Sequence, residues 1–314
     1  MGDRSVNFSF TEFQLIGFTD LKAYRPILFI PFCIILVYTV FANGILIIII
    51  AKERKLHAPM YILIGLIAAL GFFAPIHFIP RMLVGFLWEM NTITRHECLI
   101  QMFCLHFFAC FQSTIVLGMA VDRYFAIIYP LRYTLLFTLI RSGTIMFTLV
   151  ALAAPLSFCE SNVIHHCYCD HMALVSLACD SISKNNAMGL VVIICFVGID
   201  ISVIFFSYVK ILHVVLGAAA GEDRWKAFHT YGTHLMVMMC FYFVGSITFL
   251  SRNLNIPIPV DVNTFLDVMY IVFPASVNPI IYGVRTKEIR NALLKMFKTN
   301  INRVFIVKVS TIKI

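Results

Sequence analysis

Long apolar runs alternate with short polar segments along almost the whole chain. Each run is bounded by charged residues, Pro or Gly, and most are close to the roughly 20 apolar residues that cross a bilayer as one helix. The pattern predicts an all-α membrane protein, a seven-transmembrane helix bundle over residues 26–284. Its spans are expected at 26–51, 59–83, 98–123, 141–158, 189–216, 227–251 and 262–284, after an N-terminal segment at 1–25.

A shorter amphipathic segment follows the last run. Apolar residues recur at helical spacing between Thr286 and Lys298, interrupted by Lys and Arg. Such a helix lies along a membrane surface with its apolar face among the lipids. We therefore expect residues 285–314 to form a tail that carries a short amphipathic C-terminal surface helix.

Composition narrows the class of protein. Of the 314 residues, 61% are hydrophobic and only 13% are charged, whereas soluble domains contain about 25% charged residues. The formal net charge is +8, and in a membrane protein such an excess gathers at the cytoplasmic face. We expect membrane lipid as a partner, with no nucleic acid and no cofactor.

Lysine and arginine are distributed unevenly between the two sides of the predicted bundle. Seventeen of the 24 fall on the side of the C-terminal tail, Arg141 among them, and seven on the side of the N-terminus. The positive-inside tendency makes the tail cytoplasmic. The segment 1–25 is then extracellular, in a multi-pass protein of the plasma membrane, and Asn7 of Asn7-Phe8-Ser9 becomes a glycosylation candidate.

Half of the ten cysteines fall on the predicted extracellular side, where disulfides form. Because five is an odd number, at most two bridges form among them and one thiol is left over. The five are Cys98, Cys159, Cys167, Cys169 and Cys179.

Four motifs, spread over most of the chain, resemble those of a known family. They are Leu56-His57-Ala58-Pro59-Met60-Tyr61, the string from Met119 to Tyr133 around Asp122-Arg123-Tyr124, the string from Lys226 to Leu235, and Pro274 with Asn278-Pro279-Ile280-Ile281-Tyr282. The Asp-Arg-Tyr and Asn-Pro-x-x-Tyr strings are similar to the rhodopsin-like, class A G-protein-coupled receptors. The longer strings resemble the olfactory receptors among them.

The resemblance implies a small odorant-like ligand and a heterotrimeric G protein, most simply the stimulatory kind that raises cyclic AMP. It implies that Arg123, held by Asp122 beside Tyr124, is released on activation and meets the G protein. Tyr208 and Tyr282 would then support it, Asn278 and Pro279 would let the seventh helix bend, and Lys226 would lie at the edge of the cleft. An ionisable residue at the bilayer edge needs a partner, and a breakable pair suits a switch.

The resemblance also implies two disulfides, Cys98–Cys169 and Cys159–Cys179. Cys98–Cys167 is the competing pair, and the sequence leaves both open.

A ligand pocket is expected in the outer half of the bundle. Spacing back from Arg123 places four residues on the inward stripe of the third helix, and the resemblance supplies the other walls. The expected lining residues are Leu105, His106, Ala109, Cys110, Val192, Ile193, Phe196, Tyr242, Gly245, Ser246, Phe249, Val268 and Ile271. An imidazole within a span usually faces the bundle, so His106 either anchors a ligand carboxylate or carbonyl or joins two helices.

Several positions are similar to the class I, or fish-like, olfactory branch, which is associated with water-soluble and often acidic odorants. They are His106, Asp200 and Ala58. Two other positions depart from the wider family, since Gly71 and Gln112 stand where relatives often carry an acid. A sodium ion needs oxygen ligands and compensating charge, so we expect no internal sodium site.

Other functions are disfavoured by the same pattern. His165, His166, Cys167, Cys169 and His171 resemble a metal-ligand cluster, but zinc sites usually show two spaced ligand pairs, so we expect solvated loop histidines and no metal. A transporter tends to carry several acids at the membrane midplane, and Asp200 is the acid that the pattern places deep in a span. A membrane enzyme would need clustered acids or histidines within the spans, so no enzymatic activity is expected.

Overall fold

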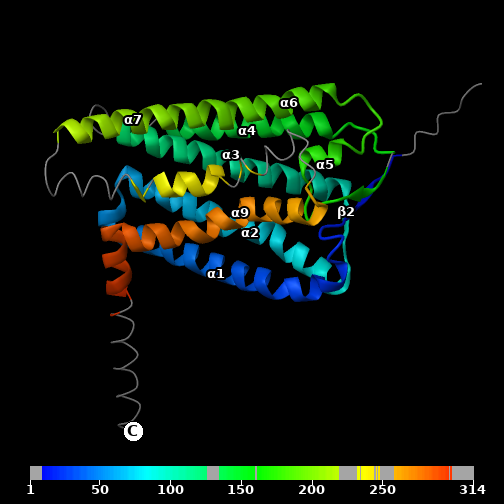
Figure 1. The fold of residues 1–314 in the computed structure, drawn as a ribbon, viewed down its shortest axis with the longest axis horizontal. Coiled ribbons are helices and arrows are strands. Elements are labelled where there is room, and N and C mark those ends of the chain that lie inside the picture. Colours follow the sequence, from blue (N-terminus) through cyan, green and yellow to red (C-terminus); the bar gives the residue numbers. More distant parts are fainter. Residues whose placement is uncertain are drawn as a thin grey trace, which may run out of the picture.

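A computed structural model describes residues 9–125, 134–159, 161–218, 232–233, 235–243, 245, 247, 258–296 and 298. Its long helices run side by side as one bundle (Figure 1). They are α1 (Arg25–Lys52), α2 (Pro59–Trp88), α3 (Arg95–Phe125), α4 (Thr134–Ala153), α6 (Ser183–Ile193) with α7 (Asp200–Ala218), and α9 (Val260–Arg285). A π-helical stretch, Ile194–Ile199, joins α6 to α7.

The sixth span is represented by helical residues 235–243, drawn in yellow between α3 and α9 (Figure 1). Five helices in the described ranges are long and apolar enough to cross a membrane, counting α6 with α7 as one, and the segment Ile140–Ala153 is a shorter apolar helix. The seven-helix bundle predicted from the sequence is therefore confirmed.

The fourth helix is shifted toward the N-terminus relative to the expected span 141–158. It ends at Ala153, two residues before Pro155, because a proline disfavours helical geometry in the residue that precedes it. It begins at Thr134, since Arg141 does not interrupt it. Arg141 lies inside the helix with its charge paired, so it was wrong to use that charge as a boundary.

Lipid-facing surfaces are rich in large apolar side chains. Phe41 on α1 and Phe205 and Phe206 on α7 are each more than 60% exposed. A soluble protein rarely presents such a continuous apolar face to water. A bilayer requires one, because its hydrocarbon core cannot solvate polar side chains.

A small sheet and a short helix cover one end of the bundle, which we call the sheet end. Strand β1 (Glu12–Leu15) pairs antiparallel with β2 (Thr92–Thr94) and parallel with β3 (Val163–Ile164), and α5 (His171–Val175) lies beside them (Figure 1). The all-α expectation did not include this sheet. The strands are two to four residues long, too short for a period-two pattern to mark them.

The N-terminal segment is folded against the sheet end. Phe13 is completely buried and Phe18 is 2% exposed, with the Phe18 ring among those of Phe32 and Phe86. Phe18 has φ 54°, a left-handed conformation that costs a non-glycine residue energy, and this aromatic packing offsets it. Residues 9–24 are therefore part of the globular structure.

The opposite end of the bundle, which we call the tail end, carries the expected amphipathic helix. It covers residues 287–296 and runs across the direction of the long helices (Figure 1). Ile289 is completely buried in a cluster with Tyr282, while Leu294 is 54% exposed. One apolar face thus anchors the helix to the bundle and leaves part of it for lipid.

Two disulfides hold the sheet end together. Cys98 of α3 is bonded to Cys169, with Cα atoms 5.4 Å apart, and Cys159 is bonded to Cys179, with Cα atoms 5.9 Å apart. These are the pairs that the resemblance implies. Cys167 is a buried free thiol, so the competing Cys98–Cys167 pair does not form.

Candidate ligand-binding site

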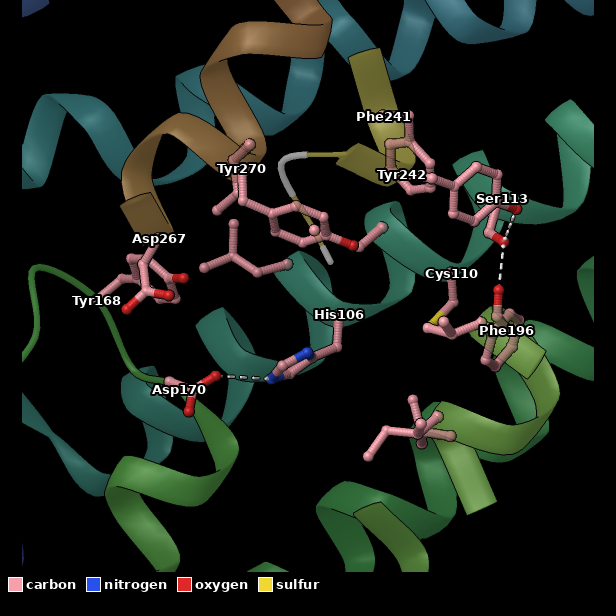
Figure 2. A pocket seen from close by; sticks show the side chains of 17 residues that line it. His106, Cys110, Ser113, Tyr168, Asp170, Phe196, Phe241, Tyr242, Asp267 and Tyr270 are labelled. Atoms are coloured by element: carbon pink, nitrogen blue, oxygen red, sulfur yellow. Dashed lines mark hydrogen bonds and ion pairs between the residues drawn. The ribbon is translucent and has the colours of Figure 1, made fainter. Parts of the chain in front are cut away.

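A cavity of about 240 Å³ opens among the helices near the sheet end. Residues of α3, the α6–α7 helix, the sixth span, α9 and the loop before α5 line it. Figure 2 shows that His106 and Cys110 from α3, Tyr270 from α9 and Phe196 point into the same space. The walls are mostly apolar, with a few polar groups, as is usual for a small-molecule site.

Most of the expected pocket residues line this cavity. Ten of them do: Leu105, His106, Ala109, Cys110, Val192, Ile193, Phe196, Tyr242, Gly245 and Ile271. Val268 does not, because it is completely buried in the apolar cluster behind the cavity, and Asp267, one position earlier on α9, lines it in its place. Ser246 and Phe249 lie outside the described residues.

Seven lining residues were not expected from the sequence. They are Ser113, Tyr168, Asp170, Val197, Phe241, Asp267 and Tyr270. Tyr168 and Asp170 flank Cys169, so the bond between Cys169 and Cys98 carries them to the cavity. The implied disulfide was the signal that could have placed these loop residues against the third helix.

His106 is paired with the loop above the cavity. Its Nε2 lies 3.7 Å from Oδ1 of Asp170 (Figure 2). The other oxygen of Asp170 caps α5, accepting hydrogen bonds from the backbone N–H groups of Met172 and Ala173 at 3.1 and 3.3 Å. This contact links α3 to the cap of α5 at the wall of the cavity, so His106 stays a candidate for both of the roles expected for it.

Two histidines of the expected solvated group are buried. His166 is 7% exposed, with Nδ1 3.2 Å from Oδ2 of Asp267, and His171 is 3% exposed. Burial, helped by nearby His106, lowers the pKa of His171 to about 4. The interpretation as solvated histidines was wrong for both, because the loop folds inward over the cavity; His165 alone is exposed among the three.

A polar network forms the floor of the cavity. Ser113 Oγ lies 2.9 Å from Tyr242 Oη, 2.9 Å from Asp200 Oδ2 and 3.2 Å from the carbonyl of Phe196. Arg141 Nη1 lies 3.1 Å from Asp200 Oδ1, and its guanidinium lies 4.7 Å from the Phe196 ring centroid. Counting Arg141 as a cytoplasmic charge was therefore wrong, because its guanidinium is paired with Asp200 inside the bundle.

Of the expected switch residues, the four whose side chains the structure describes lie toward the tail end. Tyr208 and Tyr282 are buried in one cluster, and Tyr282 Oη lies 3.8 Å from Met119 Sδ. Asn278 and Pro279 are buried within α9. Asp122, Arg123 and Tyr124 belong to α3, but their side chains lie outside the described part of the chain, as do Lys226 and Asn7.

Asn43 occupies the region beside Gly71. Its Nδ2 donates hydrogen bonds to the carbonyls of Thr39 and Ala275 at 2.8 and 2.9 Å. A Cβ atom added at Gly71 would lie 2.9 Å from Asn43 Oδ1, which is closer than side chains tolerate. Glycine at this position therefore makes room for an amide that ties α1 to α9.

The arrangement of the helices matches that of a solved structure. A crystal structure of squid rhodopsin superposes with a TM-score of 0.68 at 17% sequence identity, covering 88% of this chain and 86% of that one. The fold is that of a rhodopsin-type seven-helix protein.

Sequence comparison narrows the class to one family. A family model described as "Olfactory receptor" matches residues 32–300. Human Olfactory receptor 52K2 is 37% identical over 298 residues, covering 91% of this chain and 95% of that protein. Human Olfactory receptor 51E1 is 37% identical over 304 residues (92% and 94%), and mouse Olfactory receptor 51E2 is 34% identical over 312 (95% and 97%).

The chain belongs to the olfactory receptor family. It is a multi-pass protein of the plasma membrane and a signalling receptor, not an enzyme.

Proposed function

We propose that this receptor binds a small odorant in the 240 Å³ cavity and, through the sixth helix, activates a stimulatory G protein that raises cyclic AMP. The observation that carries the proposal is the position of Tyr242. Its side chain lines the cavity, and its hydroxyl lies 2.9 Å from Ser113 of α3. A ligand in contact with Tyr242 can therefore act on the helix whose movement opens the tail end.

The sheet end faces outward in this proposal. Both disulfides lie there, and disulfides persist in an oxidising exterior. The tail end carries most of the lysines and arginines, even without Arg141, which suits the cytoplasm. Asn7 is then on the outer side and open to glycosylation.

The cavity favours a ligand with a compact apolar body and one polar head. Its volume is below the roughly 300–1,000 Å³ of drug-sized sites. The apolar wall at Cys110 and the Phe196 ring suits the apolar part, and His106 with Asp170 suits the head. A hydroxyl or carbonyl can join that pair as it stands, whereas a carboxylate must displace Asp170 from His106. Neutral oxygen-bearing odorants are therefore favoured over the acids that the class I likeness indicates.

Activation requires the ligand to bind one state better than the other. Contacts with Tyr242 that change its bond to Ser113 would supply this difference. The cleft around Arg123 and Tyr282 would then open to the G protein, with Lys226 at its edge. A ligand that binds both states equally tightly would produce no signal.

The test is cyclic AMP in cells that express the chain, challenged with alcohols, aldehydes, carboxylic acids, amino acids and amines. We expect a response to neutral oxygen compounds that His106→Ala weakens and Arg123→Ala abolishes while surface expression persists. A response confined to acids would overturn the ligand class. Loss of the response in cells that lack the stimulatory G protein would support the coupling, and an unchanged response there would contradict it.

A further inference from the structure

A histidine lies on the outer, lipid-facing side of α2. His77 is exposed, and so are Phe73, Ile76 and Pro80 on the same helix. Residues three and four positions apart share one face of a helix, so we call these four residues the His77 face. None of them is among the residues that line the ligand cavity. The His77 face is therefore directed at the bilayer and not at the odorant.

The position of His77 along α2 gives its depth in the membrane. Trp88 is the last residue of α2, at the sheet end, and it is 65% exposed. Exposed indole rings of this kind lie at the membrane–water interface. His77 precedes Trp88 by eleven residues, which is a helical rise of about 16 Å, and the hydrocarbon core is about 30 Å thick. His77 therefore lies near the middle of the bilayer, out of reach of lipid headgroups.

The imidazole of His77 has no polar partner within the described part of the chain. Its ring packs edge-on against Phe108 of α3, with centroids 6.4 Å apart, and makes no hydrogen bond to a described residue. A neutral imidazole carries one donor and one acceptor, and leaving them unpaired in hydrocarbon is costly. Ionisable residues in a span usually face the interior of the bundle. His77 departs from that rule and requires a partner from outside the chain.

The backbone adds a second polar group to the same face. Pro80 lies inside α2, and because proline has no N–H it cannot donate to the carbonyl of Ile76, four residues earlier. Ile76 is 40% exposed on the His77 face. A backbone carbonyl without its helical donor is unfavourable in lipid. The His77 face thus combines an apolar surface with polar groups that the hydrocarbon cannot satisfy.

We propose that the His77 face binds a second copy of this receptor within the bilayer, in a two-fold dimer with the two His77 side chains at its axis. In a two-fold interface a residue at the axis meets its own copy. Two neutral imidazoles complement each other, because each has one donor and one acceptor. Headgroups and sterol hydroxyls lie at the interface and do not reach this depth, whereas polar contacts between spans hold membrane helices together. The dimer needs neither odorant nor G protein.

The first experiment counts dimers of the purified, fluorescently labelled full-length receptor in lipid vesicles, by single-molecule photobleaching over a range of protein densities. His77→Leu should lower the association constant about fivefold or more. This variant should fold, because leucine suits a lipid-facing position. His77→Asn should retain the dimer, since an amide also offers a donor and an acceptor. Phe41→Leu is the matched control, because Phe41 is a lipid-facing residue of α1 that is 68% exposed, and it should leave the constant unchanged.

The second experiment locates the interface by disulfide cross-linking in the membrane. The partly exposed free cysteines are first replaced by serine: Cys33, Cys104, Cys195 and Cys240. A disulfide requires Cα atoms within about 7 Å, so on oxidation His77→Cys should form a covalent dimer and Phe41→Cys should not. The proposal is overturned if the unmodified receptor is monomeric at every density, if His77→Leu associates as strongly as the unmodified receptor, or if Phe41→Cys cross-links in preference to His77→Cys.

Discussion

Arg141 of α4 and Asp200 of α7 form an ion pair inside the helix bundle, with Nη1 and Oδ1 3.1 Å apart. Asp200 is completely buried and also accepts from Ser113. Removing one partner of a buried pair leaves an uncompensated charge at a cost of about 3–5 kcal/mol. Asp200→Asn or Arg141→Met should therefore lower Tm strongly, and the Arg141→Met, Asp200→Leu double variant should recover much of the loss.

An exposed ion pair provides the comparison. Lys295 Nζ lies 2.8 Å from Glu53 Oε1 at the tail end, where both side chains are at least one-third exposed. Such pairs contribute roughly 0–1 kcal/mol. Glu53→Gln should change Tm little under conditions in which Asp200→Asn unfolds the receptor. Equal effects of the two substitutions on Tm would contradict the claim that the buried Asp200 pair contributes more to stability than the exposed pair.

Replacing Gly71 with any larger residue should destabilise the protein. Gly71→Ala would force the Asn43 amide away from Thr39 and Ala275, and overpacking of this kind costs about 1–3 kcal/mol. Gly143→Ala is the matched control, because nothing lies within 4 Å of its Cβ position. Unfolding measured by fluorescence should show a lower Tm for the first variant only.

Sodium should have no specific effect on this receptor. Gly71 and Gln112 provide no charge, and Asn43 already holds the space beside Gly71. We expect Tm and basal cyclic AMP to be the same in sodium and potassium at constant chloride. A sodium-dependent rise in Tm would contradict this expectation.

Lowering the pH should destabilise the folded protein through His171 at the sheet end. Its pKa is lowered from 6.5 to about 4 in the folded protein, so the unfolded state binds more protons between these two values. The contribution of neutral His171 to the free energy of unfolding is therefore fully present above about pH 6.5. It is lost as the pH falls toward 4, by up to about 3 kcal/mol. Tm measured from pH 7.5 to 4.5 should fall less steeply in His171→Gln, whereas equal slopes would exclude His171 as the cause.

The Cys98–Cys169 disulfide should be required for the cavity as well as for stability. Removing a native disulfide costs about 2–5 kcal/mol, and here it also frees Tyr168 and Asp170 from the cavity wall. Cys98→Ser should lower both surface expression and the odorant response. Cys104→Ser, which removes a free thiol on the same helix, should leave both unchanged.

The sequence was sufficient for the helices and for much of the cavity, since helical spacing from Arg123 placed Leu105, His106, Ala109 and Cys110 on the lining face of α3. It was insufficient where distant segments meet. The pairing of Arg141 with Asp200 joins residues 59 positions apart, and only the folded bundle brings them together. Whether Asp267 or Val268 lines the cavity depends on how α9 is rotated about its axis. The hydrophobic pattern of the sequence does not determine that rotation.

The most direct test of the central claim is the response of Gly245→Ala to an agonist found in the odorant panel. A Cβ atom at Gly245 would lie 2.8 Å from the Tyr270 ring, which must then move within the cavity that both residues line. If the cavity is the odorant site, the agonist concentration for half-maximal cyclic AMP should rise about tenfold or more. Gly189→Ala, with open space around its Cβ position, should leave it unchanged. An unchanged response in Gly245→Ala at equal surface expression would place the odorant elsewhere.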